Sequence, residues 1–375
     1  MGFFGRKRAP SVPHPRKEPR FDGPLTLKRL EQIFQDCVDF TKRPVSLGEG
    51  GACTLTLCYL SGMVKMERVS DYVLRPLAQD EALARCGTPR QAMEEMMGGA
   101  LYNLSAAERT TLDEAAFDLV AGWCLMFFPG ESAVLSLFVG TEEKRSISSP
   151  SNETVLKGSR DAFVESLRTN TSIVRRHLKT PELRIREQVV GRQSVTSVDI
   201  LYIEGLTNPH LVEQVAAQLA DIDIDAVLAT GNIEEYIVPA ARTAFPLVQY
   251  TERSDRFCAG LAEGRVGILI DGLPLGYLAP GVLGDFLQAP QDKSESWLLA
   301  SALTLLRYLC MLGTLLLPAL YVAMVTFHQE MIPTRLALSI IAAKQDVPFR
   351  SVFEVIVLLL AFEILQEAGL RLPQS

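Results

Sequence analysis

The sequence predicts an α/β fold: two related α/β subdomains, followed by an α-helical membrane domain. A strand–glycine–helix pattern occurs twice, and an uncharged apolar run of membrane-spanning length lies near the C-terminus. A basic, proline-rich stretch precedes the first amphipathic segment. The expected parts are a flexible basic tail (1–24), a first subdomain (25–150), a connector (151–195), a second subdomain (196–290) and an incomplete helical membrane region (291–375).

The overall composition narrows the class of partner. The 375 residues carry a net charge of −7, which argues against nucleic acid as a main partner because duplex binding needs a basic face. The seven cysteines are dispersed and show no C-x-x-C spacing. An odd, scattered set fits reduced thiols, so we expect the N-terminal part of the chain to face the cytoplasm.

The N-terminal stretch "MGFFGRKRAPSVPHPRKEPR" has no apolar segment long enough for a secretory signal. Its basic residues favour anionic lipid, so we expect a tail on the cytoplasmic side of a membrane. Directly after it, "LTLKRLEQIFQDCVDF" spaces its apolar residues three and four apart, which predicts an amphipathic helix.

An internal repeat underlies the two predicted subdomains. The pattern of Leu55–Leu74 returns in Val198–Ala217, and each copy predicts a buried strand, a glycine turn and a helix. A second repeated pattern links "CLMFFPGESAVLSLFVG" with "VGILIDGLPLGYLAP", and each copy predicts a strand, a turn and a strand. The matched positions in the first repeated pattern are Tyr59 with Tyr202, Gly62 with Gly205, and Val69 with Val212.

Local signals place two further elements in the second subdomain. Asn208 and Pro209 have the residue types of an N-cap and a first helical position, so a helix is expected to begin there. The Asp271-Gly272 pair lies between two apolar runs, which predicts a hairpin.

A transmembrane helix is predicted from the uncharged segment Tyr308–Phe327, because about 20 apolar residues cross a hydrocarbon core. The apolar character continues upstream, and a helix over Ser296–Phe327 would be about 48 Å long, more than a bilayer is thick. Either the helix begins in the interface, anchored by Trp297 and Arg307, or an interfacial helix leads into the span. Pro318 is expected to kink it.

The last apolar segment, Ser351–Leu370, has spanning length but carries Glu354, Glu363 and Glu367. Helical spacing puts Glu363 and Glu367 on one side and Glu354 nearly opposite. One interpretation is an interfacial amphipathic helix with these carboxylates in headgroup water. The other is a pore- or cavity-lining helix whose acidic groups favour cations. The residues by themselves favour the interfacial interpretation.

Several motif-like stretches lack the residues that their chemistry requires. Gly48–Thr54 is glycine-rich but precedes a strand, so it fails as a dinucleotide loop. Asp221–Asn232 lacks the glycine and glutamate of a calcium loop. Ser132 lacks the second glycine of a nucleophile elbow. The four histidines form no metal-ligand cluster with cysteine, so we expect no enzyme, cofactor or metal site.

Six further segments occur in order within residues 40–373. They are "SNETVLKGSRDAFVESLRTN", "RRHLKTPELRIREQVVGRQS", "ILYIEGLTNP", "TERSDRFCAGLAEGRVGILIDGLP", "LLLPALYVAMVTFHQEMIPTRLALSI" and "AFEILQEAGLRLP". Together they resemble the A-type subunit of spore germinant receptors, the GerA family of endospore-forming bacteria. The chain departs from the family pattern at Ser254 and Gln329, where proline is usual, and it stops at Ser375 where family members continue with further membrane helices.

The resemblance implies a cytoplasmic two-subdomain body attached to a helical domain in the spore inner membrane. It also implies a transporter-like B-type subunit and a C-type lipoprotein subunit as partners, and a homo-oligomer that forms or gates a path for cations. By this analogy, Glu354, Glu363 and Glu367 become candidate pore-lining residues. The alternative is a membrane-tethered module that binds a small ligand between its α/β lobes and has no pore.

Overall fold

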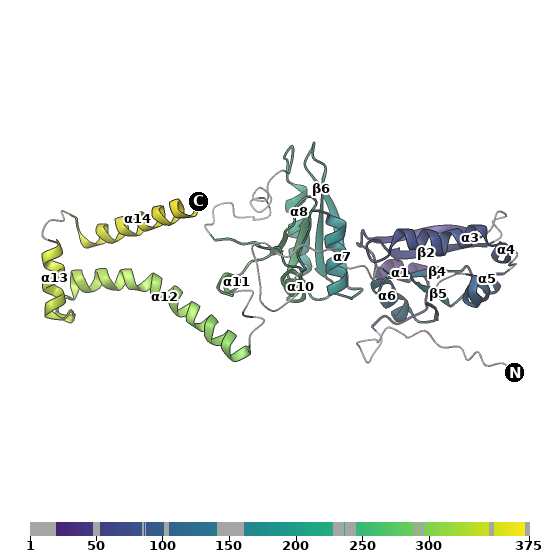
Figure 1. Ribbon diagram of the computed structural model, residues 1–375, viewed down its shortest axis with the longest axis horizontal. Helices are drawn as coiled ribbons and strands as arrows, with labels where there is room; N and C mark the ends of the chain where they lie inside the picture. Colours follow the sequence, from purple (N-terminus) through teal and green to yellow (C-terminus); the bar gives the residue numbers. More distant parts are fainter. Residues whose placement is uncertain are drawn as a thin grey trace. The chain divides into compact units, whose positions relative to one another are not determined.

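The computed structural model describes residues 20–47, 53–84, 86, 88–100, 105–140, 161–227, 236, 245–288, 292, 296–344 and 349–371. Its contacts divide the chain into two compact units, Met1–Asp285 and Phe286–Ser375. The first unit holds both predicted subdomains, and the second holds the apolar helices (Figure 1).

The first subdomain is a five-stranded antiparallel sheet with strand order β1-β2-β4-β5-β3. Helices α1 (Leu27–Ile33) and α6 (Leu112–Val120) share one apolar cluster with the sheet, and the short helical segments between 66 and 100 share the other. Strands that are covered on both faces of a sheet are apolar along their length, instead of alternating apolar and polar residues. The strands are β1 (Phe40–Leu47), β2 (Cys53–Leu60), β3 (Ala106–Arg109), β4 (Trp123–Phe127) and β5 (Val134–Phe138).

The second subdomain has a sheet of the same size with order β6-β7-β9-β10-β8. One apolar cluster joins the sheet to α7 (Leu167–His177) and α10 (Ser254–Ala262), and another joins it to α8 (Pro209–Ala220). The strands are β6 (Leu183–Val190), β7 (Thr196–Ile203), β8 (Gln249–Thr251), β9 (Val266–Ile270) and β10 (Gly276–Ala279).

The two subdomains have the same topology, which confirms the predicted repeat. In chain order the strands of each copy occupy the same places in their sheet, and a helix precedes the first strand of each. The matched glycines also correspond, because Gly62 (φ 89°) and Gly205 (φ 77°) both follow the second strand of their copy. These left-handed angles suit glycine, since it has no Cβ to clash with the backbone.

The local signals of the second subdomain are confirmed as well. Asn208 caps α8, where its Oδ1 accepts a hydrogen bond of 3.0 Å from the His210 amide, and Pro209 is the first helical residue. β9 and β10 form the predicted antiparallel hairpin, and Gly272 adopts φ 82° in its turn.

The structure differs from the predictions made from the sequence at two places. The first amphipathic helix ends at Ile33, because Asp36 adopts φ 60° and Cys37 then bridges to Ile185. In addition, residues 167–177 and 183–190, expected in the connector, form α7 and β6 of the second sheet. Their charged residues suggested an exposed linker, but Arg175 is buried by an ion pair with Asp39 of the first subdomain, and Arg184 is buried while it donates to the Ile33 carbonyl.

Some expectations concern residues beyond those described. They are the tail up to residue 19, most of the glycine-rich loop over 48–52, the end of the first subdomain over 141–150, the start of the connector over 151–160 and the acidic segment after residue 227.

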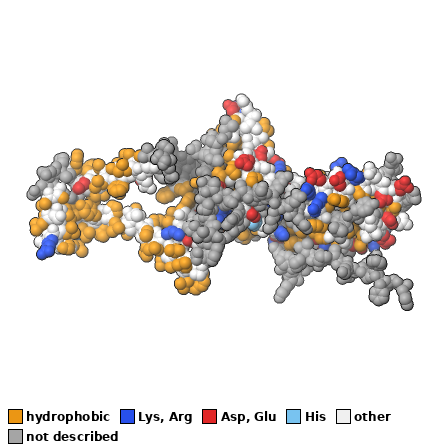
Figure 2. Space-filling view, viewed as in Figure 1, with side chains coloured by type: hydrophobic (Ala, Val, Ile, Leu, Met, Phe, Trp, Pro, Cys, Tyr) orange, Lys and Arg blue, Asp and Glu red, His pale blue; other side chains and the backbone are white. Residues whose placement is uncertain are grey.

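The second unit contains the predicted apolar helices. In the described residues, α12 (Trp297–Phe327) is the helix long and apolar enough to cross a membrane. It runs without a break through Arg307, changes direction along its length (Figure 1) and contains the helix-breaking Pro318. A short turn, η4 (Gln329–Met331), leads to α13 (Thr334–Lys344) and then α14 (Ser351–Arg371), which contacts α12. Hydrophobic side chains cover the surface of these helices (Figure 2).

Candidate functional site at the interface between the subdomains

A short parallel backbone contact joins the two subdomains. Cys37, just before β1, bridges to Ile185 in β6. The Val38 amide donates to the Ile185 carbonyl at 3.0 Å, and the Ile185 amide donates to the Asp36 carbonyl at 3.3 Å. The edge strand of the second sheet thus takes part of the first subdomain as an added strand, which fixes the register between them.

A buried ion pair lies beside this contact. Arg175 on α7 is 1% exposed and donates to both carboxylate oxygens of Asp39, at 2.8 and 3.0 Å. Burial opposes the charged guanidinium, but Asp39 and Cys37 outweigh it, so the net effect raises the pKa of Arg175. Two parallel hydrogen bonds of this kind fix orientation as well as distance.

A second arginine strengthens the same interface. Arg184 on β6 donates to the Ile33 carbonyl at the end of α1 and pairs with Glu204. The Cys37 thiol donates to the Leu183 carbonyl at 3.5 Å and lies 4.0 Å from the Arg184 guanidinium. The interface between the subdomains is therefore polar and held by hydrogen bonds, in contrast to the apolar clusters inside each subdomain.

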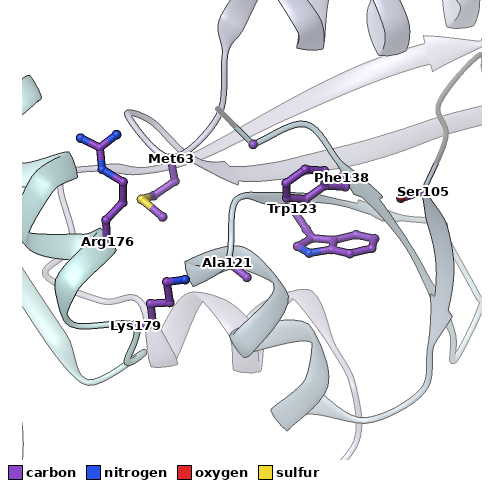
Figure 3. Close-up of a pocket in the computed structure, with 8 residues that line it drawn as sticks. Met63, Ser105, Ala121, Trp123, Phe138, Arg176 and Lys179 are labelled. Carbon is purple, nitrogen blue, oxygen red and sulfur yellow. The ribbon is translucent and has the colours of Figure 1, made fainter. Parts of the chain in front are cut away.

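A pocket of about 400 Å³ opens between the first subdomain and α7. Trp123 and Phe138 lie on one side, and Arg176 and Lys179 lie on the other (Figure 3). Neither of these cations forms an ion pair with another described residue. An aromatic wall opposite two cations suits a small ligand with an apolar body and a negative group.

The two aromatic rings of this wall are held in place by each other and by a buried arginine. Trp123 and Phe138 pack edge to face with centroids 5.5 Å apart, and the Arg109 guanidinium lies 5.8 Å from the Trp123 ring. Arg109 is bound by both carboxylate oxygens of buried Asp118, which also accepts a 2.7 Å hydrogen bond from Ser136. The wall is thus preorganised before any ligand arrives.

Asp199 on β7 is a buried acid near the N-terminal end of α7. Its side chain is fully buried, and its Oδ1 has no hydrogen-bond partner in the described residues, while Oδ2 lies 3.3 Å from Arg168. Burial raises the pKa of Asp199 to about 7, nearby Glu187, Asp39 and Asp271 add to the rise, and Arg168 opposes it. This carboxyl therefore changes protonation near neutral pH.

The predicted acidic residues lie where the sequence placed them, on α14. Glu363 and Glu367 are exposed and one turn apart, and Glu354 is half-buried. Their role as pore-lining groups stays a prediction. No cluster of three or more metal-ligating side chains occurs in the part of the chain that the structure describes.

The residues of the interface were missed by the sequence reading. Arg175 and Asp39 are 136 positions apart, and no local pattern links them. Arg168 and Arg175 fall two turns apart on one side of α7, but two cations at this spacing are equally typical of a solvated helix face. The spacing therefore did not reveal the acidic partners.

Comparison with known proteins identifies the family. The chain matches the family described as Bacillus/Clostridium GerA spore germination protein over residues 28–375. The chain belongs to the GerA family. The resemblance seen in the sequence is therefore confirmed, from the first amphipathic helix to the last residue.

Several relatives are spore germination proteins. Spore germination protein KA of Bacillus subtilis is 36% identical over 90% of this chain and 61% of its own length. GerLA of Bacillus cereus is 33% identical over 93% of this chain and 70% of its own. The membrane protein YfkQ of Bacillus subtilis is 35% identical over 93% and 67%. The chain thus spans about three fifths to seven tenths of these relatives.

A solved structure supports the fold of the first unit. The N-terminal domain of the A subunit of the Bacillus megaterium spore germinant receptor GerK3 aligns with a TM-score of 0.55 and 26% identity. The match covers 70% of this chain and 99% of that domain. The two-subdomain body is therefore shared with a germinant-receptor subunit.

The buried pair at the interface generates a stability prediction. Replacing Arg175 by Met leaves Asp39, itself 3% exposed, as a buried charge without its partner. We expect a loss of about 3–5 kcal/mol in unfolding free energy, and partial recovery when Asp39→Asn is added. Urea unfolding of the detergent-solubilised chain, followed by Trp123 fluorescence in a Trp297→Phe background, measures both.

The matched control is Arg186→Met, which breaks the more exposed pair with Glu213 in the same subdomain. A surface pair contributes at most about 1 kcal/mol. If the two arginine variants lose equal stability, the Arg175 pair does not hold the subdomains together.

Asp199 generates a pH prediction. Because its folded pKa is raised, the native state keeps a proton that the unfolded chain releases, so stability falls as pH rises from about 4 to about 7. Asp199→Asn should remove this fall and leave the variant about 1–3 kcal/mol more stable than the parent at pH 8. Unfolding midpoints between pH 5 and 8 test this, with Asp223→Asn, an exposed acid of the same subdomain, as control. Parallel pH profiles for Asp199→Asn and the parent would exclude the proposed titration.

Proposed function

We propose that this chain is an A-type subunit of a spore germinant receptor that couples nutrient sensing to cation release across the spore inner membrane. The supporting observation is the combination of a body like that of the GerK3 A subunit with an apolar helix of spanning length in one chain. In this role the body faces the cytoplasm, and the chain forms or gates the path for cations.

The interface between the subdomains supports a coupling role. The hydrogen bonds that the described residues make across it are directional, and they include the Cys37–Ile185 backbone bridge, the Arg175–Asp39 pair and the contact of Arg184 with the Ile33 carbonyl. Such contacts favour two discrete arrangements over continuous sliding. A signal changes the balance only if it binds one arrangement more tightly than the other. A ligand or partner that contacts both subdomains meets this condition.

The partners follow from the family role. We propose membrane lipid, a transporter-like B-type subunit, a C-type lipoprotein subunit and further copies of this chain. The supporting observation is the apolar surface of the second unit, where Leu315, Phe327, Phe362 and Ile364 are each more than half exposed. Surfaces of this kind require lipid or protein to cover them.

The acidic residues of α14 are the proposed cation-contacting groups. Glu354, Glu363 and Glu367 interrupt an otherwise apolar helix, and carboxylates at membrane depth usually face water and favour cations. The spacing of Glu363 and Glu367 places two carboxylates one turn apart on one side of the helix.

This role predicts a change in ion flux. Spores carrying Glu363→Gln should release potassium more slowly after a nutrient signal, or with altered selectivity among monovalent cations, because one negative charge is removed at constant side-chain size. The measurement is ion release from spores, with immunoblotting of the membrane fraction to verify insertion. Glu330→Gln, an exposed acid in η4, is the control. Unchanged flux and selectivity in Glu363→Gln would remove this residue from the pore.

A second candidate function is a membrane-tethered module that binds a small ligand and has no pore. The pocket between the subdomains favours it, because its volume of about 400 Å³ is within the usual range for small-molecule sites. Its two cations and aromatic wall fit an amino acid or another carboxylate better than a neutral sugar.

Calorimetry tests this second candidate. The solubilised chain is titrated with a panel of amino acids and sugars, and binding through the pocket predicts a heat signal that weakens about tenfold in affinity in Lys179→Met, which loses a charged contact. Arg192→Met, a surface cation paired with Asp223, should leave the signal unchanged. Absence of heat across the panel argues for the receptor role without direct ligand binding by this body.

A further inference from the structure

An exposed apolar surface lies at one end of the second sheet. It combines the segment that leads into β8 with the segment that follows β10, and the Gly281 amide joins the two by donating to the Leu247 carbonyl at 2.6 Å. Four large apolar side chains, between 36% and 71% exposed, make up this surface, which we call the apolar end. They are Phe245, Leu247, Val282 and Leu283.

The loop that carries Val282 and Leu283 is fixed by hydrogen bonds. Asp285 binds the Arg265 guanidinium through both carboxylate oxygens, with Oδ1 at 2.9 Å from Nη2, and its Oδ2 accepts a hydrogen bond of 3.0 Å from the Val282 amide. The charge of Asp285 is thereby paired, and residues 245–248 and 279–284 contain no charged side chain. The apolar end is therefore uncharged and held outside the core, which is the character of an interaction surface.

The other end of the same sheet is more polar. The strand registers place the β6–β7 hairpin at the end of the strands opposite to the apolar end (Figure 1). There Arg192 and Asp223 form an exposed ion pair, and the stretch 191–194, which has no large apolar residue, separates the exposed side chains of Val189 and Val195. The two ends of this subdomain thus differ in their affinity for water.

The apolar end is close in the chain to the membrane helix. Trp297, where α12 begins, follows Asp285 by twelve positions, and even a fully extended chain of that length spans about 40 Å. The 31 residues of α12 make about 46 Å of helix and the hydrocarbon core is about 30 Å thick, so its first turns lie at headgroup depth. A short tether of this kind makes encounters with the bilayer surface frequent. This step rests on the membrane placement of α12 in the proposed function.

We propose that the apolar end docks on the lipid surface of the bilayer that α12 crosses. Its four side chains enter the boundary between headgroups and acyl chains, where the apolar faces of surface-bound helices lie about 5–10 Å deep. The contact buries apolar area and uses no free charge, because Asp285 is already paired with Arg265. It therefore requires no particular headgroup. The second subdomain is held with its apolar end on the membrane and its β6–β7 hairpin in water.

A tryptophan placed in the apolar end tests this proposal on the full chain. In a background with Trp123→Phe and Trp297→Phe, Leu283→Trp supplies the sole tryptophan. The protein is reconstituted into phosphatidylcholine vesicles whose acyl chains carry bromine near the headgroup. We expect this reporter to be quenched by the brominated lipid and protected from aqueous iodide, with emission at shorter wavelength than the control reporter. The control is Val189→Trp in the same background, an apolar position of nearly equal exposure (57% against 56%) at the opposite end of the sheet.

A double substitution identifies the groups responsible. Phe245→Ser with Leu247→Ser should remove most of the lipid quenching of the Leu283→Trp reporter and raise its iodide quenching to the control level. Both side chains are exposed, so the fold does not depend on them. High salt should leave the lipid quenching unchanged, because salt screens charge and not apolar contact.

The contrary outcomes are distinct. Iodide quenching without lipid quenching at position 283, or equal lipid quenching of the two reporters, overturns the docking. Quenching by neither agent also overturns it, because protein such as a second copy of the chain then covers the apolar end. Trp297, kept as the sole tryptophan in the Trp123→Phe protein, reports on α12 separately. Lipid quenching of Trp297 with none at position 283 leaves the proposed function in force, whereas none at either position overturns both.

Discussion

The arrangement of the first unit depends on the buried contact between Arg175 and Asp39. Taking a guanidinium and a carboxylate out of water costs several kcal/mol each, and the loss is offset only when the two groups meet with good geometry. Because Arg175 belongs to α7 and Asp39 precedes β1, they meet only when both subdomains are folded and docked. The pair thus adds little to the stability of either subdomain and much to the specificity of their placement.

The same helix links this contact to the other notable groups of the unit. Arg175 and Arg168 lie two turns apart on α7, the first binding the neighbouring subdomain and the second lying against Asp199 in its own sheet. Arg176 and Lys179, at the C-terminal end of α7 and just beyond it, line the pocket between the subdomains. A displacement of α7 would therefore change the interface, the pocket and the environment of Asp199 together, so in the proposed receptor role α7 is the element that would transmit a signal.

What the sequence could predict was local. The strand–glycine–helix repeat, the Asn208 cap and the Asp271-Gly272 hairpin depend on residues close in the chain, and each was found where the pattern placed it. The role of α7 could not be predicted in this way, since its arginines resemble those of an exposed connector until their acidic partners are known. The pocket could not be predicted for the same reason, because Trp123 and Lys179 come from different subdomains.

The repeat shows that the buried acid Asp199 occurs in only one of the two copies at this position. With Tyr59 matched to Tyr202, Thr56 of β2 corresponds to Asp199 of β7, and the pairing partners Pro44 and Glu187 correspond as well. Identical topology therefore places a neutral pair in one copy and two acids in the other. Since the backbone is common to both copies, the buried acid is not required by the fold. Its desolvation and the proximity of Glu187 destabilise the native state at neutral pH, so the acid at this position costs stability that the matched Thr56 of the first copy does not cost.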